Sequence, residues 1–501
     1  MRTYVRLGLL LAVLAVAVLA GGGTPAYAWS YPAALNSNAA TDSGNDWDPQ
    51  VTTDGAGNWV AVWVGSDDLG GTIDTDRDIL VARSTDNGGT WTAPAALNTN
   101  AATDSGDDYL PQVTTDGVGN WVAVWDSSEN LSGSIGEELD ILVSRSTDNG
   151  ASWTPPAALN SNAATDGGYD QHPQVTTDGS GNWVAVWGSN DTLGSTIEND
   201  WDILVARSTD NGATWTAPAA LNTNADTDSG WDTRPQVTTD GGGNWVAAWE
   251  SNENLAGGIG EDFDILVARS TDNGASWTYP AALHTNAPTT WGADSFPQVT
   301  TDGGGNWVAV WQSGDSLGGS IGEDYDILVS RSTDNGASWT DASALNTNAA
   351  SDSIPDNFPQ MTTNGTGYWR AVWKSALADQ DISESHSTDN GDTWTAPALL
   401  NSNGSTDSGN DDHPQVTTDG GGNWVAVWSS NDTLGGPLWL DGDILYATEY
   451  IPPYPPVGGL AELPDAAGSS GPNYALLAGL AAAALVALGA GGWYARRRWQ
   501  G

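Results

Sequence analysis

The segment PQVTTDGAGNWVAVW, at residues 49–63, recurs seven times along this chain. The other six copies begin at Pro111, Pro173, Pro235, Pro297, Pro359 and Pro414. Five successive spacings between copies are 62 residues, and the last is 55. A chain of 501 residues has room for about three ordinary domains. Self-similarity at a regular period instead predicts that residues 29–450 form one repeat array.

Each repeat unit is predicted to contain four short strands. In the first unit these are PQVTTD (49–54), NWVAVW (58–63), DILVARS (78–84) and WTAPAALN (91–98). The second is apolar at nearly every residue, which suits a strand buried on both faces. Repeats of this size with four strands each predict an all-β protein, a β-propeller with one blade per repeat. An open solenoid is the alternative.

The two ends of the array predict how the propeller closes. Residues 29–35, WSYPAAL, match a fourth strand that has no unit before it. The last unit ends at residues 443–450, a third strand with no fourth strand after it. Pairing these two segments would satisfy both free strand edges. The sequence therefore predicts seven four-stranded blades, with the N-terminal strand joining the last blade.

The segments outside the array predict export and membrane anchoring. Residues 1–28 resemble a secretory signal, with Arg2 and Arg6 before an apolar run and AYA as the cleavage site. Residues 451–473 form a Pro/Gly/Ser-rich linker, and the uncharged residues 474–495 are long enough for one transmembrane helix. The basic tail, 496–501, favours a cytoplasmic C-terminus with the propeller outside the cell membrane. An uncleaved N-terminal anchor and a clipped C-terminal sorting signal are the alternatives.

The composition excludes several function classes. The chain has no cysteine, which rules out disulfides and thiolate metal sites. Of its 14 basic residues five lie in the signal and the anchor, so nine remain in the exported part beside 63 acidic residues. A nucleic-acid partner is therefore not expected, because such binding needs a basic surface. Of the 28 tryptophans, 21 recur at fixed repeat positions and are predicted to pack within and between blades.

A second motif, STDNGGTW at residues 84–91, forms the predicted turn between the third and fourth strands. Six units carry it, and its aspartate can accept hydrogen bonds from the backbone of its own turn. The glycine two residues later can adopt a positive φ. The aspartates of the six turns are Asp86, Asp148, Asp210, Asp272, Asp334 and Asp389.

This motif resembles the Asp-box, or bacterial neuraminidase repeat, and the array of about 420 residues resembles the sialidase-type propeller superfamily. The resemblance implies that the Asp-boxes are structural and lie opposite any active site. Catalytic members carry three arginines, a Tyr–Glu pair, an Asp acid/base and an early Phe/Tyr-Arg-Ile-Pro motif, which is absent here. Within the repeat array, the arginines that do not directly precede an Asp-box are Arg77, Arg234 and Arg370, at different places in their blades. The resemblance therefore implies the fold more strongly than an enzyme activity.

A ligand site is predicted where the repeats differ from one another. The residues just before the first strand and just after the second strand vary from copy to copy. Both positions should surround the mouth of the central channel, and varied residues on a rigid scaffold are typical of binding. Drift on an exposed surface is the alternative. The candidates are Asp48, His172, Arg234, Phe296, Phe358, His413, Asp126, Glu250 and Lys374.

Two aspartate positions, in contrast, occur in all seven copies. One opens the third strand (Asp78 in the first unit), and the other lies three residues before the proline of the first strand. Oxygen ligands on acidic loops suit calcium, and turn capping by aspartate is the alternative. The calcium candidates are Asp46, Asp108, Asp170, Asp232, Asp294, Asp356 and Asp411. No other cofactor is indicated.

Three functions remain open. The first is a non-catalytic propeller for surface binding or adhesion, with a glycan or protein ligand. It is favoured because catalysis needs an asymmetric set of different residues, whereas near-identical repeats supply the same residues seven times. The second is an exo-sialidase-like glycoside hydrolase. The third is a structural acidic surface protein.

Overall fold

The computed structural model describes residues 28–451, except residues 43, 256–257, 285–291, 377–378, 405–408 and 435–440. The chain divides into two compact units, Met1–Pro453 and Tyr454–Gly501, and all the described residues belong to the first. The predicted linker, membrane helix and tail, and the signal up to residue 27, lie outside the described residues, apart from residue 451. Within the described part of the chain, no helix is long and apolar enough to cross a membrane.

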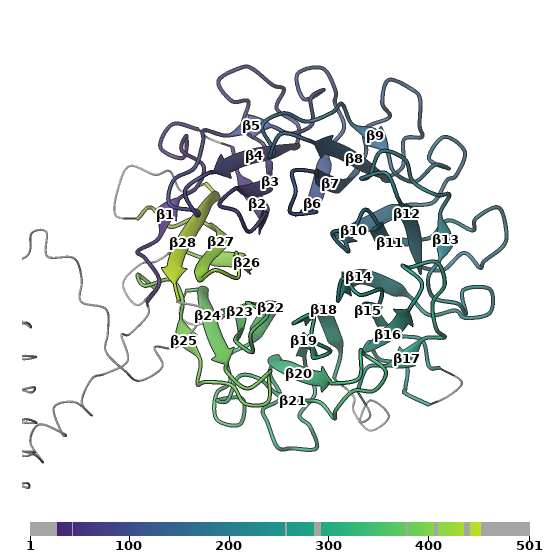
Figure 1. Cartoon of the computed structure of the whole chain (residues 1–501), viewed down its shortest axis with the longest axis vertical. Coiled ribbons are helices and arrows are strands. Elements are labelled where there is room, and N and C mark those ends of the chain that lie inside the picture. Colours follow the sequence, from purple (N-terminus) through teal and green to yellow (C-terminus); the bar gives the residue numbers. More distant parts are fainter. Residues whose placement is uncertain are drawn as a thin grey trace, which may run out of the picture. The chain divides into compact units, whose positions relative to one another are not determined.

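Seven antiparallel four-stranded sheets surround a central channel as the blades of a propeller (Figure 1). The innermost strands are β2 (Asp46–Thr53), β6 (Asp108–Thr115), β10 (Asp170–Thr177), β14 (Asp232–Thr239), β18 (Asp294–Thr301), β22 (Asp356–Thr363) and β26 (Asp411–Thr418). The second strands are β3 (Trp59–Gly65), β7 (Trp121–Ser127), β11 (Trp183–Ser189), β15 (Trp245–Ser251), β19 (Trp307–Ser313), β23 (Trp369–Ser375) and β27 (Asn423–Ser430).

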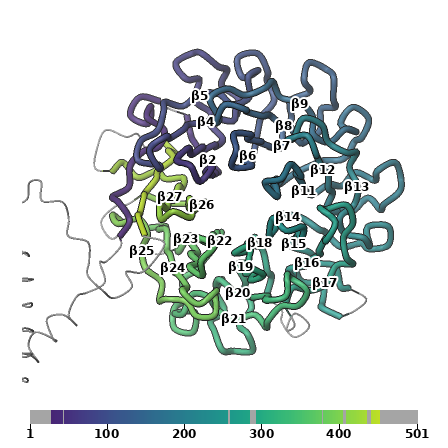
Figure 2. The backbone as a smooth tube through the Cα atoms, viewed as in Figure 1, coloured from purple at the N-terminus to yellow at the C-terminus, as the bar shows by residue number. Residues whose placement is uncertain are grey.

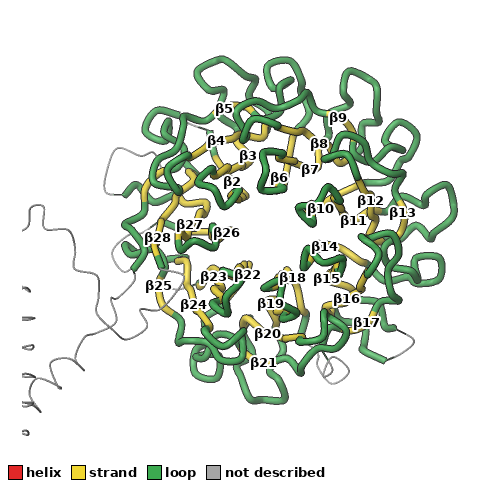
Figure 3. Tube along the Cα trace, in the orientation of Figure 1, coloured by secondary structure: helices red, strands yellow, loops and turns green. Residues whose placement is uncertain are grey.

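The outer half of each blade consists of two further strands. The third strands are β4 (Asp78–Ser84), β8 (Asp140–Ser146), β12 (Asp202–Ser208), β16 (Asp264–Ser270), β20 (Asp326–Ser332), β24 (Asp381–Ser387) and β28 (Asp443–Tyr450). The outermost strands are β5 (Ala95–Ala96), β9 (Ala157–Ala158), β13 (Ala219–Ala220), β17 (Ala281–Ala282), β21 (Ser343–Ala344), β25 (Ala398–Leu399) and β1 (Ala33–Ala34). Figure 3 shows no helix among the described residues, so the predicted all-β fold is confirmed for them.

The hydrophobic core lies between neighbouring blades. All seven residues of β3 are buried, because the adjoining blade covers each face of the sheet. Trp59 and Trp63 on one face pack against the last blade, and Val60 and Val62 on the other pack against the second blade. The same arrangement gives seven core clusters among the described residues. The 14 tryptophans of the second strands are at most 1% exposed, as their predicted packing role requires.

The ring closes as the sequence predicts. The chain passes once around the channel, and its two described ends meet in the last blade (Figure 2). In that blade β1 pairs antiparallel with β28, with Ala33 opposite Tyr446 and Ala34 opposite Leu445. The Leu35 amide also donates to the Ile444 carbonyl at 2.7 Å. These contacts exclude the open solenoid.

The outermost strands are shorter than predicted. Eight residues, 91–98, were expected to form the fourth strand of the first blade, but β5 contains only Ala95 and Ala96. These two residues pair with Val81 and Leu80 of β4. Pro94, directly before them, has no N–H to donate to the ladder. The proline therefore prevents the pairing of this strand from extending toward Trp91, but β21 is equally short with Ala342 at the corresponding position, so proline is not the general cause.

Candidate functional site

The first strand of every blade carries a β-bulge at the channel. In β2, Trp47 pairs with Val64 and Gln50 pairs with Val62, so Asp48 and Pro49 together oppose one residue. Asp48 adopts a left-handed backbone with φ of 50°, and the matching residues of the other six blades have φ between 48° and 56°. A residue with a Cβ atom pays about 1–2 kcal/mol for this conformation. Strain at one position in all seven blades marks it as a candidate functional site.

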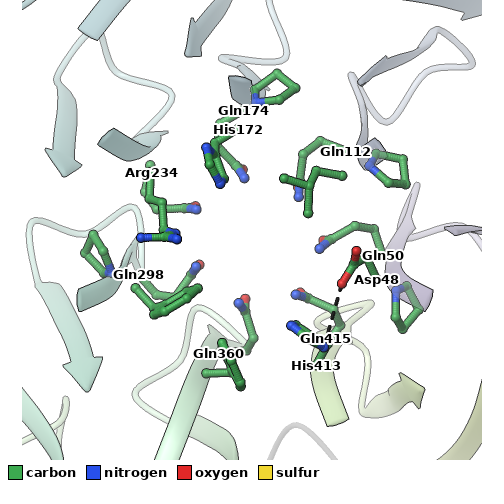
Figure 4. A pocket seen from close by; sticks show the side chains of 18 of the residues that line it. Asp48, Gln50, Gln112, His172, Gln174, Arg234, Gln298, Gln360, His413 and Gln415 are labelled. Carbon is green, nitrogen blue, oxygen red and sulfur yellow. Dashed lines mark ion pairs between the residues drawn. The ribbon is translucent and has the colours of Figure 1, made fainter. Parts of the chain in front are cut away.

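Seven side chains of five types, one from each of these bulges, surround one cavity of about 420 Å³ (Figure 4). We call them the variable ring: Asp48, Leu110, His172, Arg234, Phe296, Phe358 and His413. All six candidates that the sequence placed before the first strand are members of it. A second set, the glutamine ring, lines the same cavity two residues further along each strand: Gln50, Gln112, Gln174, Gln236, Gln298, Gln360 and Gln415.

The glutamine ring was missed by the sequence reasoning. Its signal was present, because a Pro-Gln pair opens all seven copies of the first strand. Only the bulge shows that this glutamine faces the channel, since the bulge changes which residues of the strand point inward. Each glutamine offers a carbonyl oxygen that accepts and an amino group that donates hydrogen bonds. The channel therefore combines one varied ring with one uniform ring of amides.

An arc of touching side chains makes the variable ring asymmetric. The Phe358 ring lies 4.7 Å from Phe296, edge to face, and 4.5 Å from His413, measured between ring centres. The Arg234 guanidinium carbon lies 4.5 Å from the centre of the Phe296 ring. At the other end, His413 Nδ1 is 3.7 Å from Asp48 Oδ1, the ion pair drawn in Figure 4. The arc thus runs from a cation through aromatic rings to a carboxylate.

Burial shifts the pKa of two members of the variable ring. The pKa of His172 is lowered to about 4, first by burial and second by the nearby positive charge of Arg234. His172 is therefore neutral at pH 7. The pKa of Asp48 is raised by burial, while His413 acts in the opposite direction and the Asp412 carboxylate adds to the increase.

The other three candidates, Asp126, Glu250 and Lys374, do not line the cavity. Glu250 is 3% exposed, forms an ion pair with Arg234, and accepts a hydrogen bond from the Phe296 amide at 3.2 Å. Lys374 Nζ lies 2.8 Å from the Asp412 carboxylate. Burial raises the pKa of Asp126, which is 3% exposed. Glu250 and Lys374 therefore hold members of the variable ring or their neighbours in place.

The three arginines that a sialidase-type site would need do not meet. Only Arg234 lines the cavity. Arg77 lies beside Asp107, at 3.9 Å, in the outer loops. Arg370 is 2% exposed between Glu384 and Glu449, with its guanidinium carbon 4.7 Å from the centre of the Trp29 ring. The lining residues of the cavity also include no tyrosine.

The Asp-boxes have the local geometry that the motif predicts. In the first box, Asp86 Oδ1 accepts hydrogen bonds from the Ser84 hydroxyl and the Thr90 amide, both at 2.8 Å. Gly88 has a φ of 78°, and a Cβ atom on it would lie 2.5 Å from a methyl carbon of Val425 in the last blade. These hydrogen bonds lower the pKa to about 2 in five boxes: Asp148, Asp210, Asp272, Asp334 and Asp389.

The aspartates considered for calcium lie between consecutive blades. Asp202 opens the third strand of one blade, and Asp232 opens the first strand of the next. Asn222 joins them, because its Nδ2 donates to Asp202 Oδ1 at 2.7 Å and to Asp232 Oδ2 at 2.9 Å. An asparagine makes the same bridge at four other junctions: Asn36, Asn160, Asn346 and Asn401.

A third carboxylate, which the sequence reasoning missed, joins these pairs from the loop between blades. Oxygen atoms of Asp200, Asp202 and Asp228 lie within 4.8 Å of one another, and three other junctions contain similar aspartate triads. Burial raises the pKa of Asp202 to about 8 and that of Asp228 to about 7. The signal was a recurrent aspartate four residues before the one that opens the first strand: Asp42, Asp104, Asp166, Asp228, Asp352 and Asp407.

Comparisons with known proteins agree with this architecture. Residues 186–432 match the family of BNR repeat-like domains. A sialidase of Bacteroides fragilis (strain YCH46) is 29% identical over 138 residues, which are 23% of this chain and 25% of the sialidase. The chain thus spans only a quarter of the length of that relative.

Several solved structures are also similar. A protein of unknown function from Dyadobacter fermentans DSM 18053 is 14% identical, with a TM-score of 0.46, over 85% of this chain and 100% of that one. The Hadza microbial sialidase Hz136 is 16% identical, with a TM-score of 0.45, over 78% and 76% of the two chains. The seven four-stranded blades, the six Asp-boxes and the match of residues 186–432 to BNR repeat-like domains together support a sialidase-like Asp-box propeller.

Proposed function

We propose that this propeller is a non-catalytic binding module that takes the end of a carbohydrate chain into the mouth of its channel. The observation that carries the proposal is the variable ring. Seven strained bulges point side chains of five types into one cavity, while the scaffold beneath them stays the same. A repeat protein that maintains strain at seven such positions uses them for recognition.

The chemistry of the cavity suits a sugar. Phe296, Phe358 and His413 provide adjoining ring faces, and ligand pockets combine such apolar walls with a few polar groups that fix orientation. The glutamine ring supplies amides that can donate to and accept from hydroxyl groups. Arg234 can pair with a carboxylate, so an acidic sugar is the preferred form of the ligand.

An exo-sialidase-like hydrolase is the second candidate, and its support is the relative named a sialidase. The geometry favours binding instead. Of the three arginines that a catalytic member would need, only Arg234 lines the cavity. General acid–base and nucleophilic catalysis also need a base held beside a nucleophile, and no tyrosine is present among the lining residues to act as the family's nucleophile.

A glycan array that includes neutral and acidic sugars tests the proposal with the purified protein. Binding of a carbohydrate end should weaken at least tenfold in Phe358→Ala, because the arc loses its central ring. The control is Tyr279→Ala, which removes a 61%-exposed aromatic side chain outside the cavity. Equal loss in both variants, or no binding to any glycan, would contradict the proposal. Turnover of a fluorogenic sialoside that disappears in Arg234→Gln would establish the hydrolase.

The proposed location is the cell surface, with the propeller outside and a single C-terminal helix in the membrane. The support is the predicted signal at residues 1–28 and the uncharged residues 474–495 followed by arginines. Protease treatment of intact cells should remove the propeller and leave a short membrane-bound fragment. Protection of the propeller until the cells are lysed would contradict this location. It would also contradict the third of the three functions, a structural acidic surface protein.

A further inference from the structure

In the described part of the chain, clusters of aspartates lie between the blades, and they share no residue with the lining of the channel cavity. The junction of the third and fourth blades shows the arrangement most completely. Asp200 and Asp202 come from the third blade, Asp228 comes from the connecting loop, and Asp232 opens β14 of the fourth blade. The Asn222 amide group donates hydrogen bonds to one oxygen of Asp202 and to one oxygen of Asp232, and these bonds hold both side chains in place.

Several oxygens in this cluster are buried without a partner. Asp228 is 8% exposed and Asp202 is 1% exposed, yet Asp228 Oδ1 and Asp202 Oδ2 have no hydrogen-bond partner. Both oxygens of Asp200 and the Asn224 side-chain oxygen are also unpartnered. Because leaving a buried acceptor unpaired is unfavourable, the cluster requires a group that interacts with oxygen atoms.

Among the described residues, no side chain supplies the missing positive charge at this junction. Within the described chain, no lysine or arginine forms an ion pair with Asp200, Asp202, Asp228 or Asp232. Burying several carboxylates within 4.8 Å of one another is strongly unfavourable unless a cation joins them. A bound cation would both interact with the unpartnered oxygens and supply the missing positive charge.

The junction of the fourth and fifth blades differs from the others in two residues, and both differences are consistent with a cation at the other junctions. There the sequence has Thr290 in place of the loop aspartate and His284 in place of the bridging asparagine. His284 Nε2 lies 2.9 Å from Asp294 Oδ2 and 3.9 Å from Asp264 Oδ1. Where one carboxylate is missing, the chain thus places an imidazole that can carry a positive charge.

We propose that calcium ions bind between consecutive blades, in at least four aspartate clusters of this chain. The four are Asp42/Asp46/Asp443, Asp76/Asp78/Asp104, Asp140/Asp166/Asp170 and Asp200/Asp202/Asp228. Calcium accepts six to eight oxygen ligands from carboxylates and amide carbonyls in flexible geometry. Carboxylate and amide oxygens are what these four clusters offer, whereas zinc prefers the nitrogen and sulfur ligands that they lack.

In two of the four clusters the ion joins the residue that opens a third strand to the residue that opens the first strand of the next blade: Asp443 to Asp46, and Asp140 to Asp170. Asp232, which opens β14, stands two residues before Arg234, the bulged member of the variable ring. Calcium at these clusters therefore stabilises the seams between the blades that it joins and, with them, the strand starts next to the bulged residues of those blades.

The test compares two aspartates of one loop. Asp228 is buried in the cluster, and Asp226, two residues earlier, is exposed. The purified chain is stripped with EGTA, equilibrated with calcium or magnesium at pH 8, and its bound metal is counted by mass spectrometry. We expect at least four calcium ions per chain, one ion fewer in Asp228→Asn, and no change in Asp226→Asn.

Thermal unfolding gives a second measurement that separates loss of metal from loss of fold. Calcium should raise the melting temperature of the wild type. In EGTA, Asp228→Asn should melt at or above the temperature of the wild type, because one buried charge has been removed. Fewer than one calcium per chain in the wild type, equal binding of magnesium, or an unchanged calcium count in Asp228→Asn would each overturn the proposal.

Discussion

Replacing Trp29 with alanine should weaken the ring more than the same change at the matching tryptophan of a standard blade. Trp29 precedes β1 and packs in the core between the sixth and seventh blades, with 8% of it exposed. Its Nε1 donates to Glu384 Oε2 at 2.9 Å, and the Arg370 guanidinium carbon lies 4.7 Å from its ring. Trp215, at the same position of the third blade, is only partly buried, and its Nε1 has no hydrogen-bond partner.

The magnitude follows from these contacts. Truncating a buried tryptophan to alanine costs about 3–5 kcal/mol, and a hydrogen bond to a charged group contributes about 1.5–3 kcal/mol. Because such contributions are not additive, we expect Trp29→Ala to lower the free energy of unfolding by about 5 kcal/mol. For the partly buried Trp215 we expect about half of that, roughly 2–3 kcal/mol.

Urea unfolding followed by far-ultraviolet circular dichroism measures both values. Trp29→Phe is the intermediate variant, because it keeps most of the apolar contact and loses the hydrogen bond, at about 2 kcal/mol. It also remains informative if Trp29→Ala does not fold. Free energies for Trp29→Ala and Trp215→Ala within about 0.5 kcal/mol of each other would refute the view that the N-terminal seam is specially reinforced.

Three further predictions concern the bulges, the Asp-boxes and the channel. Leu110→Gly should be more stable than Leu110→Ala by about 1 kcal/mol in urea unfolding, because only alanine keeps the Cβ strain at a φ of 48°; the reverse order would contradict the strain. The hydrogen bonds of its box lower the pKa of Asp210 to about 2, so the stabilisation by this carboxylate is complete above about pH 4 and is lost as the pH falls toward 2. Asp210→Asn should accordingly lower the melting temperature at pH 7 more than at pH 2, and an equal effect at both would exclude the carboxylate hydrogen bonds as the cause. The pKa of His172, lowered to about 4, should rise in Arg234→Gln when followed by nuclear magnetic resonance, because one nearby positive charge is removed; no change would show that burial accounts for the whole shift. Because the pKa of His172 is lower in the folded chain than in the unfolded chain, the unfolded chain binds its proton first. His172 therefore destabilises the fold as the pH falls from about 6.5 toward 4.

Much of the site could be predicted because the repeats act as their own comparison. The variable ring is found by asking which position before the first strand changes from copy to copy. The left-handed bulge was not foreseen, although a residue before proline is disfavoured in the helical region. Whether that residue becomes extended or left-handed depends on the pairing with the second strand, which local sequence does not show.

Arg370 illustrates the opposite case. From the sequence it was one of three arginines available for a carboxylate, since its blade differs from the others at this point. The structure places it between Glu384 and Glu449 and against Trp29, which lies more than 340 residues earlier in the chain. The unusual residues of the sixth blade thus serve ring closure, because the N-terminal segment meets the ring there.

The sequence by itself determined the seven units, the strand order within each and the closure of the ring, because strand patterning and turn chemistry are local and repeat at a fixed period. Only the tertiary structure decided which side chains of different blades meet. The glutamine ring, the arc from Arg234 to Asp48 and the aspartate clusters each combine residues from different repeats, and their distances depend on the curvature of the closed ring. Local sequence carries no information about that curvature until neighbouring blades pack against each other.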